Sequence, residues 1–162
     1  MIERFRRWFE YEQDAHAKVL ASFETVPPER RDGHEFRKAV ALFGHIVAAR
    51  RVWLFRLGVI PTAGALFLDD ENPDVARVAS EWAEVRGLWA GYLASLDDAG
   101  LGRVFEYQSF DAGRFRNTVE DVLTQLFGHS WYHRGQIAVR VRAAGGTPAV
   151  TDLIYWCREP VG

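Results

Sequence analysis

The feature that most constrains this chain is the recurrence of apolar residues at helical spacing in four long segments. The first segment runs from about Ile2 to Phe23. One apolar stripe follows it at intervals of three and four, through Phe5, Trp8, Phe9, Ala15, Val19 and Leu20. The second, from about Glu35 to Leu57, is apolar around much of its circumference, which is typical of a helix buried in a bundle. Proline or glycine follows each segment, at Pro27 and at Gly58.

The third and fourth segments carry start and stop signals of their own. Asn72-Pro73 is predicted to open the third, because proline suits the first helical turn, and the segment frays at Asp97-Asp98-Ala99-Gly100. Thr118 followed by Asp121 resembles a capping pair at the start of the fourth. The Gly145-Gly146 pair, with Pro148 beyond it, ends that segment.

Two shorter elements complete the expected fold. Residues Val104 to Phe115 alternate apolar and polar side chains around Asp111-Ala112-Gly113, which predicts a small β-hairpin. Asp152 to Cys157 is predicted to form a short helix. We therefore predict an all-α protein: a four-helix bundle with a hairpin between helices three and four and a short C-terminal helix. Residues 1–162 are expected to form a single domain.

Composition excludes several classes of function. The chain has 162 residues and a formal net charge of −2, with no block of Lys and Arg, so no nucleic-acid partner is expected. Its single cysteine, Cys157, excludes an internal disulfide and fits a reducing compartment. The N-terminus is charged from its third residue, and no apolar run reaches membrane-spanning length. We expect a soluble cytoplasmic protein without a membrane partner.

The tetrapeptide LFGH occurs twice, ending at His45 and at His129, and a further histidine follows at His133. His129 and His133 are four residues apart, so they lie on one helix face and can approach a single metal ion. His45 lies in the very apolar second segment, where a buried imidazole without a partner would cost about 1–3 kcal/mol. Together the three predict a metal site between two helices. The alternative for His45 is a core histidine with an ordinary hydrogen-bond partner.

The fourth segment places further polar residues beside the histidine pair. One face carries Val122, Gln125, His129, His133, Gln136 and Arg140. A flank of Val119, Leu123, Leu126, Ile137 and Val141 adjoins that face. This polar stripe fits a pocket inside a bundle, and exposure to water is the alternative. His16 is expected on the polar side of the first segment and His34 at a junction of loop and helix, with no role for either.

Two known metal motifs are absent. Ser130, Trp131 and Tyr132 separate the histidines, so there is no HExxH sequence with its general-base glutamate. No Glu-x-x-His occurs, which disfavours a ferritin-like di-iron site. Three imidazoles suit Zn²⁺, Ni²⁺, Fe²⁺ or Cu²⁺, and affinity alone does not select among them. We expect Zn²⁺ first, with Ni²⁺ or Fe²⁺ as alternatives. Such a site leaves a coordination position open, as catalytic metal sites do.

Three stretches resemble the DinB family: HSWYHRGQIA at 129–138, LFGHIVAARRVWLFRL at 42–57 and TPAVTDLIYWCRE at 147–159. The resemblance spans essentially the whole chain, and HxxxHRGQ is its most specific part. It implies an up-down-down-up bundle in which His45, His129 and His133 hold a divalent metal. It also implies a homodimer, for which Phe127 and Trp131 are candidate contacts, with packing inside the bundle as the alternative. The wider superfamily includes S-transferases that use low-molecular-weight thiols.

Three hypotheses for function follow. The first is a metal-dependent S-transferase acting on a small-molecule substrate with a low-molecular-weight thiol. The second is a metal-dependent hydrolase, whose base would have to come from Glu10, Glu12 or Asp14 in the first segment. The third is a bundle that binds a metal or ligand without catalysis.

Further residues are candidates for supporting roles. Gln136 is expected to orient a ligand histidine. Gln125, Tyr132 and Trp8 are expected near the pocket, although an aromatic side chain in a bundle is usually part of the core. Arg134 and Asp152 form a candidate ion pair between the fourth segment and the C-terminal tail.

Overall fold

The structure is a computed structural model that describes residues 1–64, 74–109 and 113–161. Along the chain lie α1 (Ile2–Glu24), a 3-10 turn η1 (Pro28–Arg30), α2 (His34–Arg56), α3 (Val75–Ser95), the short α4 (Asp98–Leu101), β1 (Val104–Gln108), β2 (Arg114–Thr118), α5 (Val119–Ala143) and the short α6 (Leu153–Cys157). The predicted all-α class, the hairpin and the short last helix are confirmed. The Asn72-Pro73 start and residues Asp111 and Ala112 of the predicted turn lie outside the described residues.

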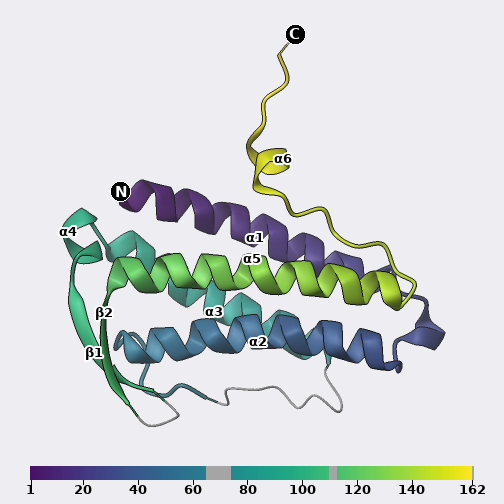
Figure 1. The fold of residues 1–162 in the computed structure, drawn as a ribbon, viewed down its shortest axis with the longest axis horizontal. Helices are drawn as coiled ribbons and strands as arrows, with labels where there is room; N and C mark the ends of the chain where they lie inside the picture. The colour runs from purple at the N-terminus through teal and green to yellow at the C-terminus, as the bar shows by residue number, and fades with distance from the viewer. Residues whose placement is uncertain (65–73, 110–112, 162) are drawn as a thin grey trace.

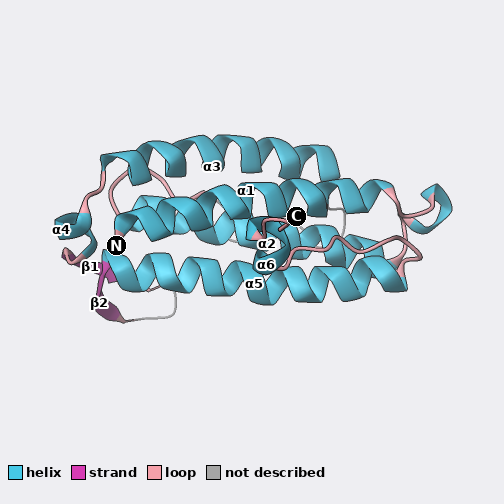
Figure 2. Ribbon diagram, turned by 90° about the horizontal axis from the view of Figure 1, so that it is seen from above, coloured by secondary structure: helices cyan, strands magenta, loops and turns pink. Residues whose placement is uncertain are grey.

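The four long helices form the predicted up-down-down-up bundle. α1 and α5 run in one direction, and α2 and α3 run in the other, with α3 beginning at the end of the bundle opposite to the end of α2 (Figure 1). Seen from above, the helices lie nearly parallel, with α4 and the hairpin at the end that carries the N-terminus (Figure 2). Each long helix packs most extensively against two others, in the order α1, α3, α2, α5 and back to α1.

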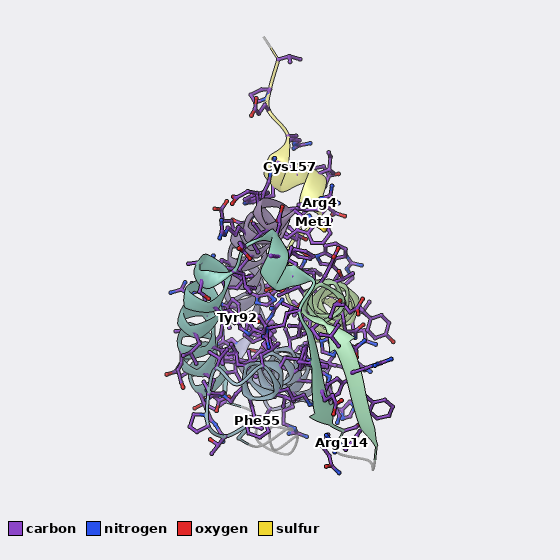
Figure 3. The ribbon with its side chains drawn as sticks, turned by 90° about the vertical axis from the view of Figure 1, so that its left-hand side faces the viewer. Met1, Arg4, Phe55, Tyr92, Arg114 and Cys157 are labelled. Carbon is purple, nitrogen blue, oxygen red and sulfur yellow. The ribbon has the colours of Figure 1, made fainter. Side chains whose placement is uncertain are left out.

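Apolar side chains from all four helices fill the interior, as the view along the bundle shows (Figure 3). Trp89 of α3 is fully buried, and its indole N–H donates to the carbonyl oxygen of Arg50 at 3.2 Å. The rings of Phe23, Phe36 and Phe43 pack edge to face. Phe127 is 1% exposed and packs against Phe5 and Trp8. It is therefore a core residue, and the proposal that it contributes to a dimer interface is wrong.

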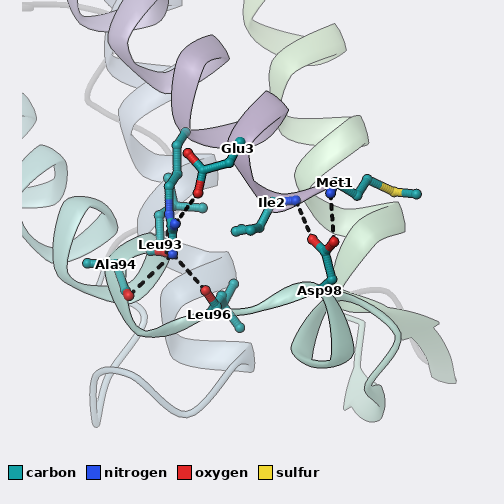
Figure 4. A network of polar contacts seen from close by, with 8 residues as sticks. Met1, Ile2, Glu3, Leu93, Ala94, Leu96 and Asp98 are labelled. Atoms are coloured by element: carbon teal, nitrogen blue, oxygen red, sulfur yellow. Dashed lines mark hydrogen bonds and ion pairs between the residues drawn. The ribbon is translucent and has the colours of Figure 1, made fainter.

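The start of α1 is held against the end of α3 (Figure 4). Asp98 accepts from the Met1 ammonium at 2.8 Å and from the Ile2 N–H at 2.6 Å. Arg6 donates to the carbonyl oxygens of Leu93 at 3.2 Å and Leu96 at 2.8 Å. Carbonyls at a helix end have no partner within the helix, so these bonds satisfy them. The stretch predicted to fray therefore forms α4 and anchors the N-terminus.

The hairpin and the caps of α5 follow the sequence signals. β1 and β2 pair antiparallel, with Val104 opposite Thr118. The Thr118 hydroxyl accepts from the Asp121 N–H at 3.1 Å, and the Asp121 carboxylate accepts from the Thr118 N–H at 3.0 Å. This capping box starts α5 directly after β2. At the other end Gly145 has φ 88°, a left-handed conformation that glycine adopts without strain.

The C-terminal segment leaves the end of α5 and passes over α1 before it extends away from the bundle (Figure 1). The Tyr11 hydroxyl donates to the carbonyl oxygen of Thr151, and the Tyr11 and Trp156 rings pack edge to face. These contacts fix the segment to α1. Among the described residues, no helix is long and apolar enough to cross a membrane.

Candidate metal centre

His45, His129 and His133 lie together on the seam between α2 and α5. The Nε2 atom of His129 lies 3.1 Å from Nε2 of His45 and 3.1 Å from Nε2 of His133. All three potential ligand atoms lie within 4.8 Å of one another. Each ring is partly buried. The two copies of LFGH therefore deliver histidines from two helices to one place.

Helix geometry explains this convergence. His129 and His133 are one turn apart on α5, so their rings project from the same face. α2 is the antiparallel neighbour of α5, and it presents His45 at the same height along the seam. Ile46 and Val47 beside His45 are buried in the core. The burial of these apolar neighbours fixes the rotation of α2 and so turns the His45 ring toward α5.

The spacing of the three nitrogens fits a shared ion. Zn–N bonds of about 2.0–2.1 Å at tetrahedral angles place ligand nitrogens about 3.3 Å apart. The observed 3.1 Å separations are close to that value. Each neutral imidazole carries a single N–H, so the three nitrogens cannot all satisfy one another by hydrogen bonds. A divalent cation among them would accept all three lone pairs.

Gln136 contacts one of the three rings. Nδ1 of His133 lies 2.8 Å from the side-chain oxygen of Gln136, one turn further along α5. When Nδ1–H donates to this oxygen, Nε2 carries the lone pair and faces the other two rings. This contact places Gln136 where a residue that orients a ligand histidine is expected.

Burial keeps His129 neutral. The pKa of His129 is lowered to about 4, chiefly by burial and in part by the charges of His133, His45 and Arg50. Above pH 5 the ring therefore offers a lone pair rather than a second proton. Neutral imidazole is the form that binds a metal.

Comparisons with known proteins identify the family of this chain. The family model described as the DinB superfamily matches residues 15–137, which is most of the chain and includes all three histidines. The chain belongs to the DinB superfamily. Protein DinB of Bacillus subtilis (strain 168) is similar, with 25% identity over 154 residues, covering 89% of this chain and 88% of that protein. No solved structure gives a significant match.

Membership in the DinB superfamily, a metal-binding family, agrees with the donor set on the α2–α5 seam. Among the described residues, the only group that could hold a metal ion is this one, and it contains no carboxylate. The fit rests on three convergent nitrogens that lack enough protons to satisfy one another. Imidazole-only sites suit Zn²⁺, Ni²⁺ and Fe²⁺ alike, so the geometry does not select one ion.

The other candidate residues lie at different distances from this centre. The Tyr132 ring is 5.1 Å from the His133 ring and is 65% exposed, so it borders the site on its solvent side. Gln125 is exposed on α5. Trp8 packs against Phe127 and Trp131, on the side of α5 that faces α1. The contacts of Trp8 thus place it with the core aromatic rings and not with the histidines.

The structure also contains a buried polar cluster that the sequence did not predict. Arg50 of α2 donates to Glu12 of α1, and its Nη2 lies 3.5 Å from the Ser130 hydroxyl on α5. Glu12 and Arg50 are 0% and 1% exposed. Glu12 was a candidate base for hydrolysis, and it is instead the partner of a buried guanidinium. Of the other candidates, Glu10 is exposed and Asp14 pairs with Lys18 at 2.7 Å.

His16 belongs to the same cluster, and its expected place on the polar side of α1 is wrong. It is fully buried, with its ring 4.5 Å from that of Trp82 and 5.2 Å from that of Phe43. Its Nε2 lies 3.9 Å from the Glu12 carboxylate. Burial lowers the pKa of His16 well below its usual value, and Arg134 and Arg50 lower it further. A neutral ring is the form that this environment permits.

Arg134 is buried beside this cluster. It donates to the Tyr11 hydroxyl at 2.6 Å, and its guanidinium stacks over the Tyr11 ring. The predicted partner, Asp152, lies on the exposed tail. The side chain thus joins α5 to α1 through Tyr11, and Tyr11 in turn binds the tail at Thr151.

A sequence signal for the buried cluster existed. Glu12 is three residues beyond Phe9 and three before Ala15, both buried, so it lies within the apolar stripe of α1. Arg50 stands four residues from Ile46 and four from Leu54. Charged residues at core positions of two separate helices indicate a buried ion pair.

Proposed function

We propose that this member of the DinB superfamily is a divalent-metal-dependent enzyme that transfers a low-molecular-weight thiol to an electrophilic small molecule. The observation that supports the proposal most directly is the convergence of three imidazole Nε2 atoms at a partly buried site with no carboxylate among them. Three protein ligands leave a position for an exogenous group, as in catalytic metal sites. Zn²⁺ is the ion we expect first.

A divalent ion held by His45, His129 and His133 would supply Lewis acidity that deprotonates a thiol at the open position. In the transfer, the sulfur would form a bond to the electrophilic carbon, the leaving group would depart with the bonding electrons, and the thiol proton would pass to solvent. Gln136 keeps the lone pair of His133 directed at the site. The partly buried setting limits the access of water that would compete with the thiol.

The hydrolytic alternative is less well supported. Water activated by a metal ion normally works with a nearby general base. Within the described residues the histidine group includes no carboxylate, and Glu12 is bonded to Arg50. Purely structural metal binding is the remaining alternative, and it predicts binding without turnover. We also propose a cytoplasmic homodimer, with the 40% exposed Trp131 as a candidate contact.

Turnover separates these functions. Protein loaded with Zn²⁺, Ni²⁺ or Fe²⁺ is mixed with a small thiol and an activated aryl chloride, and the thioether is followed by its absorbance. We expect turnover in the wild type that His129→Ala abolishes and that His34→Ala retains. His34 is the matched control because it is exposed at the first residue of α2. Stoichiometric metal with no thioether for any thiol, or equal rates in both variants, would contradict the proposal.

A further inference from the structure

A pocket opens between α5 and the C-terminal segment, on the side of α5 that faces α1. Its volume is about 470 Å³, which is in the range of small-molecule sites. Two charged residues line it, Arg134 of α5 and Asp152 of the tail, together with the aromatic residues Tyr11 and Trp131. The histidine centre lies where α5 meets α2, so this pocket is separate from it.

The guanidinium of Arg134 has two nitrogens without a partner. Arg134 is 3% exposed, and its Nη2 donates to the Tyr11 hydroxyl at 2.6 Å. Its Nε and Nη1 are buried and have no hydrogen-bond partner among the described residues. The nearby buried acid, Glu12, pairs with Arg50. A buried charge is costly unless it is paired, so Arg134 favours an anionic partner from outside the chain.

A small cavity adjoins the pocket beside this guanidinium. Its volume is about 10 Å³, which is room for about one oxygen-sized group. Arg134, Ala138, Ala149 and Thr151 line both the cavity and the pocket. One oxygen of a carboxylate that enters from the pocket would therefore fill the cavity next to Arg134.

Asp152 contributes the opposite charge on the solvent side of the pocket. It is exposed, and as the N-cap of α6 its side chain makes no capping hydrogen bond. Within the described part of the chain, neither Asp152 nor Arg134 forms an ion pair, so the candidate pair between them is not made. With Glu12 and Arg50 included, two cations face two carboxylates. The balance is neutral, but one positive and one negative group remain unpaired.

From this arrangement we infer that the pocket binds a small zwitterion of the amino-acid type. Its carboxylate meets Arg134, its ammonium group meets Asp152, and its apolar side chain lies against Trp131 and Leu153. An anion without the ammonium group would be repelled by Asp152, and a cation without the carboxylate would be repelled by Arg134. The inference does not depend on the proposed transfer reaction, because none of these residues is a member of the histidine centre.

The test compares three ligands of one carbon skeleton. Leucine, isocaproate (which lacks the ammonium group) and isoamylamine (which lacks the carboxylate) are titrated into metal-loaded protein in a calorimeter. We expect leucine to bind about tenfold more tightly than either analogue, since a hydrogen bond to a charged group contributes about this much. Equal affinities for the three ligands, or no binding of leucine, would overturn the inference.

A charge variant on the exposed tail tests the ammonium site without disturbing the core. Asp152→Asn should weaken leucine about tenfold and leave isocaproate unchanged or slightly tighter. Glu159→Gln is the matched control, because Glu159 is also an exposed acid of the tail and does not line the pocket. If the two variants affect leucine equally, Asp152 does not bind the ammonium group and the zwitterion is wrong.

A steric variant tests the location of the site. Gly135 lines the pocket, and a Cβ added there would meet nothing within 4 Å, so Gly135→Leu projects into the open space. It should abolish binding of leucine. Gly91→Leu, at an exposed glycine of α3 with equally open surroundings, should leave binding unchanged. Wild-type affinity in Gly135→Leu would show that leucine binds elsewhere.

Two further variants separate this pocket from the metal ion. Leucine can chelate a metal through its amine and carboxylate, so its binding is also measured in His129→Ala. We expect that variant to retain it, and loss of binding there would place leucine at the histidine centre and overturn the inference. Arg134→Gln should give leucine and isoamylamine equal affinity. If Arg134→Gln does not fold, the ligand series and Gly135→Leu still decide the outcome.

Discussion

The two polar clusters of the bundle differ in how their members relate to one another. Glu12 and Arg50 carry opposite charges and form an ion pair buried in the interior. On the α2–α5 seam, three imidazoles of the same kind face one another at 3.1 Å. Groups of opposite charge can bind each other within the protein, whereas three convergent imidazole nitrogens need a bound cation as their common partner. That difference separates a stabilising cluster from a binding site, although both are polar groups in a helical bundle.

The largest effect should come from breaking the complementary pair. Glu12→Gln leaves the Arg50 guanidinium buried without a counter-charge, and the free energy of unfolding should fall by about 3–5 kcal/mol. Denaturant titration of metal-free protein measures it. Glu84→Gln is the control, because Glu84 is paired with Arg51 at the surface, where loss of the pair costs about 1 kcal/mol or less. Similar losses in both variants would contradict the distinction between buried and exposed pairs.

At the histidine cluster, a substitution should change metal affinity more than the stability of the protein. Gln136→Ala removes the acceptor for His133 and should weaken metal affinity about 10–100-fold, while the stability of metal-free protein changes little. Competition with a chromogenic chelator gives the affinity. Gln125→Ala, an exposed change on the same helix, should leave it unaltered. Unchanged affinity in Gln136→Ala would show that Gln136 does not orient the ligand.

The pH dependence of stability tests the setting of His16. Its pKa is lowered in the folded state by burial, and then by Arg134 and Arg50, while Glu12 lies 3.9 Å away. The unfolded chain therefore takes up a proton near pH 6.5 that the folded chain excludes. Stability is fully present above that pH and falls as the pH decreases below it.

His16→Leu removes this proton uptake, so the stability of metal-free protein should depend less steeply on pH below 6.5 than in the wild type. Denaturation midpoints measured between pH 7 and 5 provide the comparison. The exposed control His34→Gln should keep the wild-type slope. If His16→Leu keeps it as well, the imidazole titrates normally and the buried cluster is wrongly described.

The smallest effect is expected where the two clusters come nearest in sequence. Ser130 lies in the buried cluster and directly follows His129, and its hydroxyl is 3.5 Å from Arg50. Ser130→Ala should lower the free energy of unfolding by about 1 kcal/mol or less, with metal affinity unchanged. A marked loss of metal would show that the two clusters are coupled through this residue.

Much of the fold could be predicted from the spacing of apolar residues and from the capping and stop residues at helix ends in the sequence. The bounds of α1 and α2 were predicted within one residue, and Thr118 with Asp121 caps α5 as expected. These features depend on residues a few positions apart, which sequence shows directly. The three histidines were also predicted to converge, because two lie one turn apart and the third stands alone in an apolar helix.

Features that depend on the facing helix were harder to predict. His16 looks polar by itself, and its burial follows from Phe43 and Trp82 on two other helices. Glu12 and Arg50 are 38 positions apart, so their pairing depends on how α1 and α2 align. The pocket lined by Lys38, Leu42, Gln136, Val139 and Arg140 also depends on the register of α2 against α5. Local patterns contain no information on that register.

The central claim is that the α2–α5 seam holds a metal ion, and elemental analysis tests it most directly. Protein purified without chelators is compared with His45→Ala, His129→Ala and His133→Ala, with His34→Ala as the control. We predict close to one divalent ion per chain in the wild type and the control, and a marked loss in each of the three variants. Wild-type protein that contains no metal and takes up none from added Zn²⁺, Ni²⁺ or Fe²⁺ would contradict the account.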